Sequence, residues 1–104
     1  MRAIHLARVD KTRPVVVLTR DRARGAMSKV TVAPITSTIK GLHTEVRVGV
    51  RNGLDHEAVV SCDNVMTLPV ERLGRQVGFL HEDQESALAA AIVSAFDLRV
   101  EELE

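Results

Sequence analysis

RPVVVLT at residues 13–19 and VTVAPIT at residues 30–36 decide the fold, because both are apolar, β-branched runs of strand length. Pro14 stands near the start of the first run, where a strand tolerates proline. Pro34 lies inside the second run, so it predicts an edge position or a bulge, with irregular pairing near Thr36.

Three further segments have strand patterns. AIHLARV at residues 3–9 and TEVRVGV at residues 44–50 alternate between apolar and polar residues, and EAVVSC at residues 57–62 is a further β-branched run. Asn52-Gly53 between the last two segments is a strong turn signal. The polar stretch RDRARGAMSK at residues 20–29 is predicted to be an exposed basic loop.

The hydrophobic period changes towards the C-terminus. Over residues 82–98, apolar residues recur at the spacing of one helix face, at Leu88, Ile92, Ala95 and Phe96. Residues 64–80 divide into short pieces, with a helical turn over 70–73 and a last strand over 77–80. Short strands followed by a terminal helix predict one mainly β domain over residues 1–104, a small barrel with a C-terminal helix packed on it.

Charge is distributed unevenly along the 104 residues, although the formal net charge is zero. Residues 1–52 carry eleven Lys and Arg against three acids, a formal +8, and residues 53–104 carry the reverse, a formal −8. This asymmetry predicts a basic working face that attracts phosphates, and hence RNA. If the two halves interleave in the fold, their charges cancel.

Composition argues against several other classes of protein. Cys62 is the only cysteine, and the four histidines are scattered, so neither an internal disulfide nor a metal site is predicted. There is no glycine-rich phosphate loop, and we expect no cofactor. The chain has no apolar run approaching the ~18 residues of a membrane span and no signal-peptide pattern at its start, so we expect a cytoplasmic protein without a membrane partner.

Aromatic residues are scarce. Phe79 and Phe96 are the only ones, with no Trp or Tyr. Proteins that bind single strands usually stack bases on aromatic rings. Any stacking here must therefore come from Arg, His or Met, which argues against a passive binder that grips RNA by stacking alone.

Polar residues gather where the expected strands begin or end. Arg13 precedes the first apolar run, Thr36-Ser37-Thr38 ends the second, and Asp63-Asn64 follows EAVVSC. Polar groups at strand ends are where a barrel builds its sites.

The residues now quoted resemble a known family. RPVVVLT at 13–19, VAPITSTIKG at 32–41 and VVSCDNVMTLPVERLG at 59–74 are similar to the three signature blocks of the MazF/PemK toxins. These are sequence-specific endoribonucleases of type II toxin–antitoxin systems. The resemblance covers about residues 4–98, and the order and spacing of the blocks also fit.

The resemblance implies an SH3-like barrel, a homodimer, a cognate antitoxin as partner, and metal-independent cleavage of single-stranded RNA. It also implies that Arg13 and Thr36 are the catalytic residues. Asp63 matches an acid that some members use for catalysis or substrate contact, and Ser37 falls in the binding groove.

The chemistry of RNA cleavage suits these residue types. The 2′-OH of RNA is the nucleophile, so the protein must align it and stabilise charge on the phosphate. Arg13 can bridge two phosphoryl oxygens, while Thr36 is a poor base and is assigned to positioning. The expected products carry a 2′,3′-cyclic phosphate and a 5′-OH, and DNA should not be cut.

Other residues are candidates for supporting roles. The general base stays open among Arg13, Asp10, Asp63 and His5, and the last three are also candidates for substrate contact. We expect further RNA contacts from polar and basic residues near the strand ends and in the basic loop, namely Lys11, Ser37, Thr38, Lys40, Arg20, Arg22, Arg24 and Asn64.

Two departures from the family pattern matter. Most members have a longer loop before the Arg-Pro pair, whereas residues 9–12 are nearly all there is here, which predicts a more open groove suited to a structured RNA loop. Some members have an arginine two residues before the aspartate, but this chain has Ser61 there.

Two other functions remain as alternatives. One is a non-catalytic topoisomerase poison of the CcdB kind on the same fold, which ranks lower because such proteins depend on a C-terminal tryptophan. The other is a barrel that binds RNA without cutting it. The sequence leaves open whether mRNA, tRNA or rRNA is the target.

Overall fold

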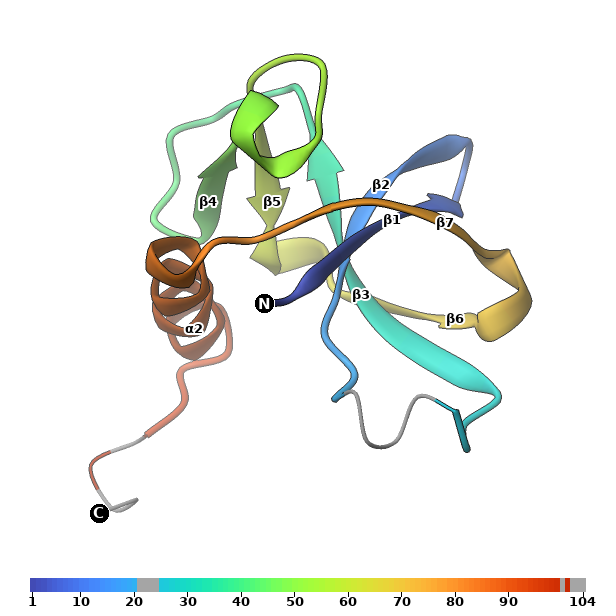
Figure 1. Ribbon diagram of the computed structural model, residues 1–104. Helices are drawn as coiled ribbons and strands as arrows, with labels where there is room; N and C mark the ends of the chain where they lie inside the picture. The colour runs from blue at the N-terminus through green and yellow to red at the C-terminus, as the bar shows by residue number, and fades with distance from the viewer. Residues whose placement is uncertain (21–24, 100, 102–104) are drawn as a thin grey trace.

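The computed structural model describes residues 1–20, 25–99 and 101 of the chain. Within these residues the chain forms a curled β-sheet and a C-terminal helix, and short 3-10 turns connect the strands from β4 to β7 (Figure 1). The elements are β1 (Ala3–Arg8), β2 (Thr12–Val17), β3 (Lys29–Thr36), β4 (Glu45–Val48), η1 (Val50–Asn52), β5 (Ala58–Ser61), η2 (Cys62–Asn64), β6 (Met66–Pro69), η3 (Val70–Arg72), β7 (Leu73–Phe79) and α2 (Glu82–Ala95).

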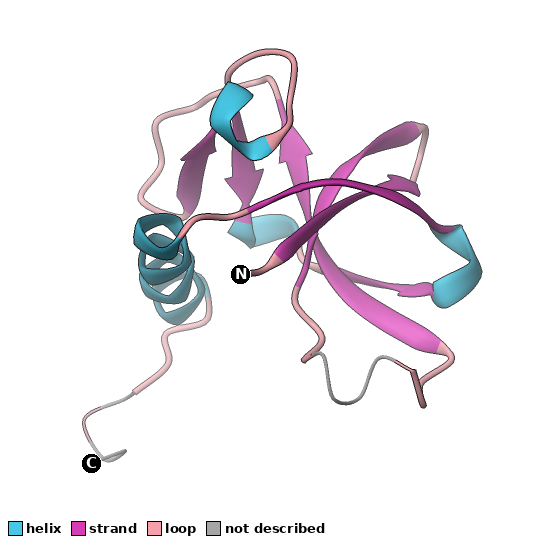
Figure 2. Cartoon of the chain, viewed as in Figure 1, coloured by secondary structure: helices cyan, strands magenta, loops and turns pink. Residues whose placement is uncertain are grey.

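The strands of the described residues form one antiparallel sheet in the order β4-β5-β3-β2-β1-β7, and β6 pairs with β3 beside β5. The sheet curls strongly, so that β6 and β7 approach one another at one end while β4 and β5 lie beside α2 at the other (Figure 2). The predicted fold class, mainly β with a C-terminal helix, is confirmed. No helix among the described residues is long and apolar enough to cross a membrane.

Strand β3 is central, which corrects the expectation from Pro34. Pro34 pairs with Val15 of β2 on one side. On its other side β3 changes partner, from β6 over Lys29–Val32 to β5 over Ile35–Thr36. Proline, which has no N–H to donate, lies where this change occurs, so a central strand accommodates it. Thr36 is regularly paired with Val59, so the expected irregular pairing near Thr36 was wrong.

Two strands were predicted incompletely. β6 was not predicted, because Met66–Pro69 is short and ends in a proline. β7 begins at Leu73 rather than at residue 77, because Gly74, Arg75 and Gln76 are exposed and give no apolar alternation. The helical turn expected over residues 70–73 is present as η3.

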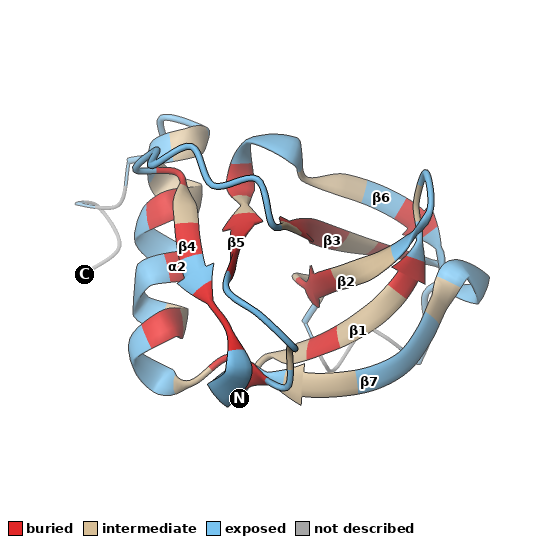
Figure 3. Ribbon diagram, turned by 90° about the horizontal axis from the view of Figure 1, so that it is seen from above, coloured by how far each residue is buried: buried red, intermediate tan, exposed pale blue. Residues whose placement is uncertain are grey.

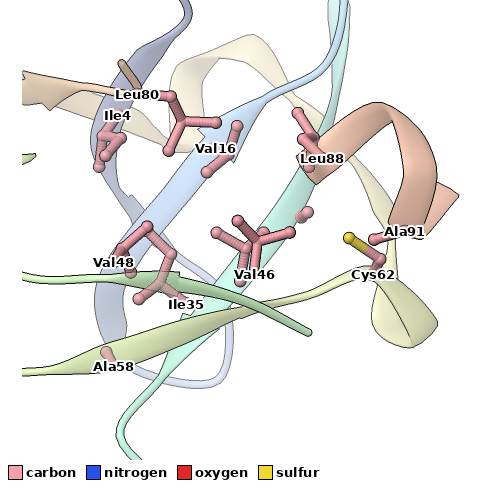
Figure 4. Close-up of a cluster of buried hydrophobic side chains, with 12 residues drawn as sticks. Ile4, Val16, Ile35, Val46, Val48, Ala58, Cys62, Leu80, Leu88 and Ala91 are labelled. Carbon is pink, nitrogen blue, oxygen red and sulfur yellow. The ribbon is translucent and has the colours of Figure 1, made fainter. Parts of the chain in front are cut away.

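The core lies on both faces of the curled sheet, which explains why the run in β2 is apolar without alternation. Val16 packs with Ile4 and Ile35 on the face towards α2 (Figure 4). Val15 and Val17 point to the opposite face, in a second cluster with residues of β1, β3 and β6. A strand buried on both faces has an almost continuous apolar sequence.

The helix α2 covers one end of the sheet and buries Leu88 and Ala91 against it (Figures 3 and 4). Ile92 and Ala95 are half-buried on the same face. Phe96 was expected on this face, but the helix ends at Ala95 and the Phe96 side chain is exposed.

A buried pair of amides fixes the loop between β4 and β5. Asn52 and Gln84 are 1% and 5% exposed and exchange two hydrogen bonds, of 2.6 and 3.0 Å. Asn52 also accepts from the N–H of Gly49 and donates to the carbonyl of Phe79. Gly53, with φ of 89°, confirms the turn expected at Asn52-Gly53 and crosses β7 so closely that a Cβ there would lie 2.1 Å from the Val77 carbonyl oxygen. The loop is therefore tied to both α2 and β7.

Candidate active site

Arg13 lies near the start of β2, where a tight turn joins it to β1. Arg8 pairs with Thr12, so residues 9–11 alone make the turn, and the short loop expected before Arg13 is confirmed. The guanidinium donates a hydrogen bond of 2.9 Å from Nη2 to Oδ2 of Asp10, and the side chain is 23% exposed. Its Nε is buried and has no hydrogen-bond partner among the described residues. The accessible part of the guanidinium lines both grooves and carries further N–H groups that can donate to an anionic ligand.

Thr36 is the last residue of β3 and is half-buried. Its hydroxyl oxygen accepts a hydrogen bond of 3.1 Å from the backbone N–H of Thr38. Because a hydroxyl has one proton to donate besides the lone pairs that accept, the Thr36 O–H remains able to donate to a ligand. This geometry suits a group that donates to an oxyanion better than one that removes a proton.

Arg13, Thr36 and Thr38 line two open grooves and so form the wall that the grooves share. The first, which we call the basic groove, has a volume of about 760 Å³. It lies between β1, β2, the end of β3, β7 and the η1–β5 loop. Its described lining residues are Leu6, Lys11, Arg13, Pro14, Ile35, Thr36, Ser37, Thr38, Gly53, Leu54, Asp55, His56, Ala58, Arg75 and Val77.

The second groove, which we call the acidic groove, has a volume of about 520 Å³. It lies on the other side of the Arg13–Thr36 wall, towards η2 and β6. Its described lining residues are Val9, Asp10, Arg13, Pro34, Thr36, Thr38, Lys40, Leu42, Glu45, Ser61, Asp63, Asn64 and Met66.

Residues from both halves of the sequence line both grooves, so the basic and acidic halves of the chain do not form separate basic and acidic faces. The basic groove is lined by three Lys or Arg and one acid, with Arg75 coming from the acidic half of the sequence. The acidic groove is lined by two Lys or Arg and three acids, two of which come from the basic half. The local balance favours phosphate binding in the basic groove.

Asp10 is exposed and supports Arg13. Backbone hydrogen bonds are the main cause that lowers the pKa of the Asp10 carboxyl, and the Arg13 guanidinium lowers it further. A carboxylate with a lowered pKa is a weak base. Asp10 is therefore better suited to orienting the guanidinium than to accepting a proton.

Asp63 and Asn64 lie in η2 and line the acidic groove. Asp63 accepts a hydrogen bond of 2.6 Å from the hydroxyl of Thr44, and Asn64 donates one of 2.7 Å to the hydroxyl of Ser61. Glu45 accepts from the backbone N–H groups of residues 40–42, at 2.9–3.3 Å, and so holds the loop that carries the exposed Lys40.

The structure brings most of the predicted residues together, but not all. Lys11, Ser37 and Thr38 line the basic groove, and Asp10, Lys40, Asp63 and Asn64 line the acidic groove. His5 lines neither groove, and its Nδ1 lies 2.9 Å from the carbonyl oxygen of Gly74. Arg20 lines a separate cleft with Arg2 and Glu85, and Arg22 and Arg24 lie outside the described residues.

Sequence reasoning missed three charged or polar residues of the basic groove, Asp55, His56 and Arg75. Arg75 lies in the exposed part of β7, and His56 lies in the η1–β5 loop next to Asp55, with which its Nδ1 interacts. The adjacent Asp55-His56 pair directly after a turn was the available signal for His56. Nothing in the local sequence connects Arg75 with residue 13.

No group of three or more His, Cys, Asp or Glu side chains that could hold a metal ion occurs in the part of the chain that the structure describes. The basic groove instead offers guanidinium, ammonium, hydroxyl and imidazole groups. These groups can bind a phosphodiester and stabilise added negative charge on it.

The chain is similar to known proteins in both sequence and structure. Residues 5–96 match the family model described as the PemK-like, MazF-like toxin of type II toxin–antitoxin systems. The chain is 58% identical over 98 residues to Endoribonuclease MazF3 of Mycobacterium tuberculosis, which covers 94% of this chain and 95% of that protein. It is 35% identical over 86 residues to Probable endoribonuclease MazF5 of the same species, covering 82% of this chain and 79% of that protein.

Solved structures show the same relationship. The structure of the Mycobacterium tuberculosis toxin MazF-mt6 superposes with a TM-score of 0.92 and 57% identity, over 94% of this chain and 99% of that one. An endoribonuclease in complex with its cognate antitoxin, from Mycobacterial species, has a TM-score of 0.83 at 19% identity, over 93% of each chain, and thus shares the fold. The resemblance seen in the sequence blocks is confirmed: the chain belongs to the PemK-like, MazF-like toxins of type II toxin–antitoxin systems.

Proposed function

We propose that this protein is a sequence-specific, metal-independent endoribonuclease toxin that cleaves single-stranded RNA by attack of the 2′-OH. One observation carries the proposal. Arg13 and Thr36, far apart in the sequence, line the same two grooves at the ends of β2 and β3. The 58% identity to a protein named as an endoribonuclease supports the same reaction.

The reaction needs the 2′-OH in line with the leaving 5′-oxygen and stabilisation of the charge that develops on the phosphoryl oxygens. The guanidinium of Arg13, which lines both grooves, donates to these oxygens. The hydroxyl of Thr36, which already accepts from Thr38, donates a hydrogen bond to the same phosphate. The products are a 2′,3′-cyclic phosphate and a 5′-OH end.

The neighbouring residues hold Arg13 or bind the substrate strand. Asp10 positions Arg13 through their hydrogen bond of 2.9 Å. Lys11, Ser37 and Thr38 contact RNA in the basic groove, and Lys40, Asp63 and Asn64 contact it in the acidic groove, on the other side of the scissile phosphate. The proposed substrate is mRNA or an exposed loop of tRNA or rRNA. Because these RNAs occur in the cytoplasm, that is the proposed place of action.

The decisive experiment is cleavage of total RNA by the purified protein in EDTA, with the ends mapped. We expect cuts at one sequence, 5′-OH and cyclic phosphate ends, and no cutting of DNA. Arg13→Ala and Thr36→Val should lose at least about 100-fold in activity, as expected when an oxyanion donor is removed.

Matched controls separate the site from general effects. Arg51→Ala removes an exposed arginine that pairs with Asp83, and Thr67→Val removes a strand hydroxyl that bonds Thr31, both outside the two grooves. These variants should cut normally. Binding of RNA without cutting would instead support the alternative of a non-catalytic RNA-binding barrel.

We also propose a cognate antitoxin and a homodimer as the assembly. The family description pairs these toxins with an antitoxin. An acidic antitoxin segment would complement the basic groove and block it. Co-purification with the product of a neighbouring reading frame tests the first proposal, and sedimentation velocity of the free protein tests the second.

A further inference from the structure

The basic groove has the composition of a nucleotide site. Part of its lining, which we call the apolar floor, consists of side chains from β1, β3, β7 and the η1–β5 loop, such as Leu6, Ile35 and Val77. Lys11, Arg13 and Arg75 supply cations around this floor. A nucleobase can lie over the apolar part while its phosphates approach the cations.

His56 carries the one aromatic ring among the described residues that line either groove. Phe79 and Phe96 are exposed but line neither groove. The side chain of His56 is 62% exposed, so a ring face is accessible to a ligand. The sequence required any base stacking to come from Arg, His or Met, and the structure places a histidine in the groove of Arg13 and Thr36.

The loop that carries His56 is held from both ends. Asn52 ties its beginning to Gln84 and to the carbonyl of Phe79. Its end enters β5, where Val59 pairs with Thr36. The Nδ1 atom of His56 contacts the carboxylate of Asp55, which restrains rotation of the ring. A ring held on an anchored loop loses less entropy when it binds a base.

We propose that His56 is the stacking platform for the nucleobase that neighbours the scissile phosphate, and hence a residue that binds and selects substrate rather than one that transfers the proton. The inference rests on the proposed function for the position of the phosphate. The base lies against the His56 ring and the apolar floor, with the backbone passing Lys11 and Arg75.

Binding measurements test this proposal without any cleavage. The probe is a fluorescein-labelled pool of 2′-O-methyl RNA of random sequence, about 12 nucleotides long, which has no free 2′-OH nucleophile. The comparison probe is an abasic 2′-O-methylribose-phosphate strand of equal length. His56→Ala should weaken binding of the RNA pool by about 5- to 150-fold and leave binding of the abasic strand unchanged.

Two variants sharpen the test. His56→Phe should restore the affinity, because phenylalanine keeps a ring but cannot transfer a proton. His43→Ala, at an exposed histidine that lines neither groove, should bind like the wild type. Unchanged binding by His56→Ala, an equal loss for the abasic strand, or failure of phenylalanine to restore binding would each overturn the proposal.

Kinetics on an RNA that the wild type cuts separate stacking from proton transfer. Stacking predicts that His56→Ala raises KM with kcat within about threefold, and that His56→Phe returns KM to near the wild-type value. A collapse of kcat in both variants, together with loss of one limb of the pH–rate profile, would make His56 an acid or base and refute the stacking role. If the wild type cuts no RNA but its binding still depends on the ring at position 56, the proposed endoribonuclease function fails while the stacking site stands.

Discussion

The buried amide pair that anchors the η1–β5 loop offers a direct test of the packing argument. Asn52 makes four side-chain hydrogen bonds, to Gly49, Phe79 and twice with Gln84. Asn52→Ala removes all of them at a position that is 1% exposed. The buried N–H of Gly49 then loses its acceptor, while Gln84 keeps its bonds to the carbonyl of Arg47 and the N–H of His81.

The expected loss follows from the groups left unpaired. One unpaired buried polar group costs about 1–3 kcal/mol, and the partly satisfied Gln84 amide adds to this, so we expect unfolding free energy to fall by about 3 kcal/mol. That is a large part of the ~5–15 kcal/mol stability of a typical domain. For a chain of this size it corresponds to a fall in Tm of about 10–20 °C.

The assay is urea unfolding followed by circular dichroism at a fixed protein concentration, because association would otherwise shift the midpoint. Asn64→Ala is the matched control, since Asn64 is exposed and makes one side-chain bond, to Ser61; it should change stability by less than about 0.5 kcal/mol. A loss below about 1 kcal/mol for Asn52→Ala would contradict the role of the amide pair, because the loop would then be held by other contacts.

Gly78→Ala should fail to fold stably, because a Cβ there would lie 1.8 Å from the carbonyl oxygen of Asn52, whereas Gly25→Ala, with nothing within 4 Å, should be neutral in thermal melts. Burial raises the pKa of the Cys62 thiol to about 11 from an ordinary value of 9.0, so stability from the neutral thiol is complete below pH 9 and declines as the pH rises towards 11. Urea midpoints measured across this range should fall for the wild type more steeply than for Cys62→Ala, and parallel curves would contradict the assignment. Arg75→Ala should reduce the slope of log affinity for single-stranded RNA against log salt concentration by about 0.7, the value expected for one lost phosphate contact, and an unchanged slope would remove Arg75 from the RNA path.

Local sequence patterns predicted the fold class, and the resemblance to the family predicted Arg13 and Thr36 as the main pair of the candidate site. The apolar runs around Val16 and Val32, the turn at Asn52-Gly53 and the later helical period are local patterns, and backbone geometry converts each into a strand, a turn or a helix wherever it lies in the fold. Arg13 and Thr36 were found through the family blocks, which are also contiguous stretches of sequence.

Which distant residues share a groove depends on how the strands pair in three dimensions. Pro34 belongs to a central strand because β3 exchanges β6 for β5 beside it, and this exchange depends on the curl of the whole sheet. His56 reaches the groove of Arg13 because the η1–β5 loop crosses β7 at Gly53. Arg75 reaches it because β7 pairs with β1, which in turn pairs with β2. His5, although close to Arg13 in the sequence, lines neither groove. Local sequence specifies backbone conformation, but the grooves are formed by segments brought together through long-range strand pairing and burial, and the spacing of residues along the chain does not encode those contacts.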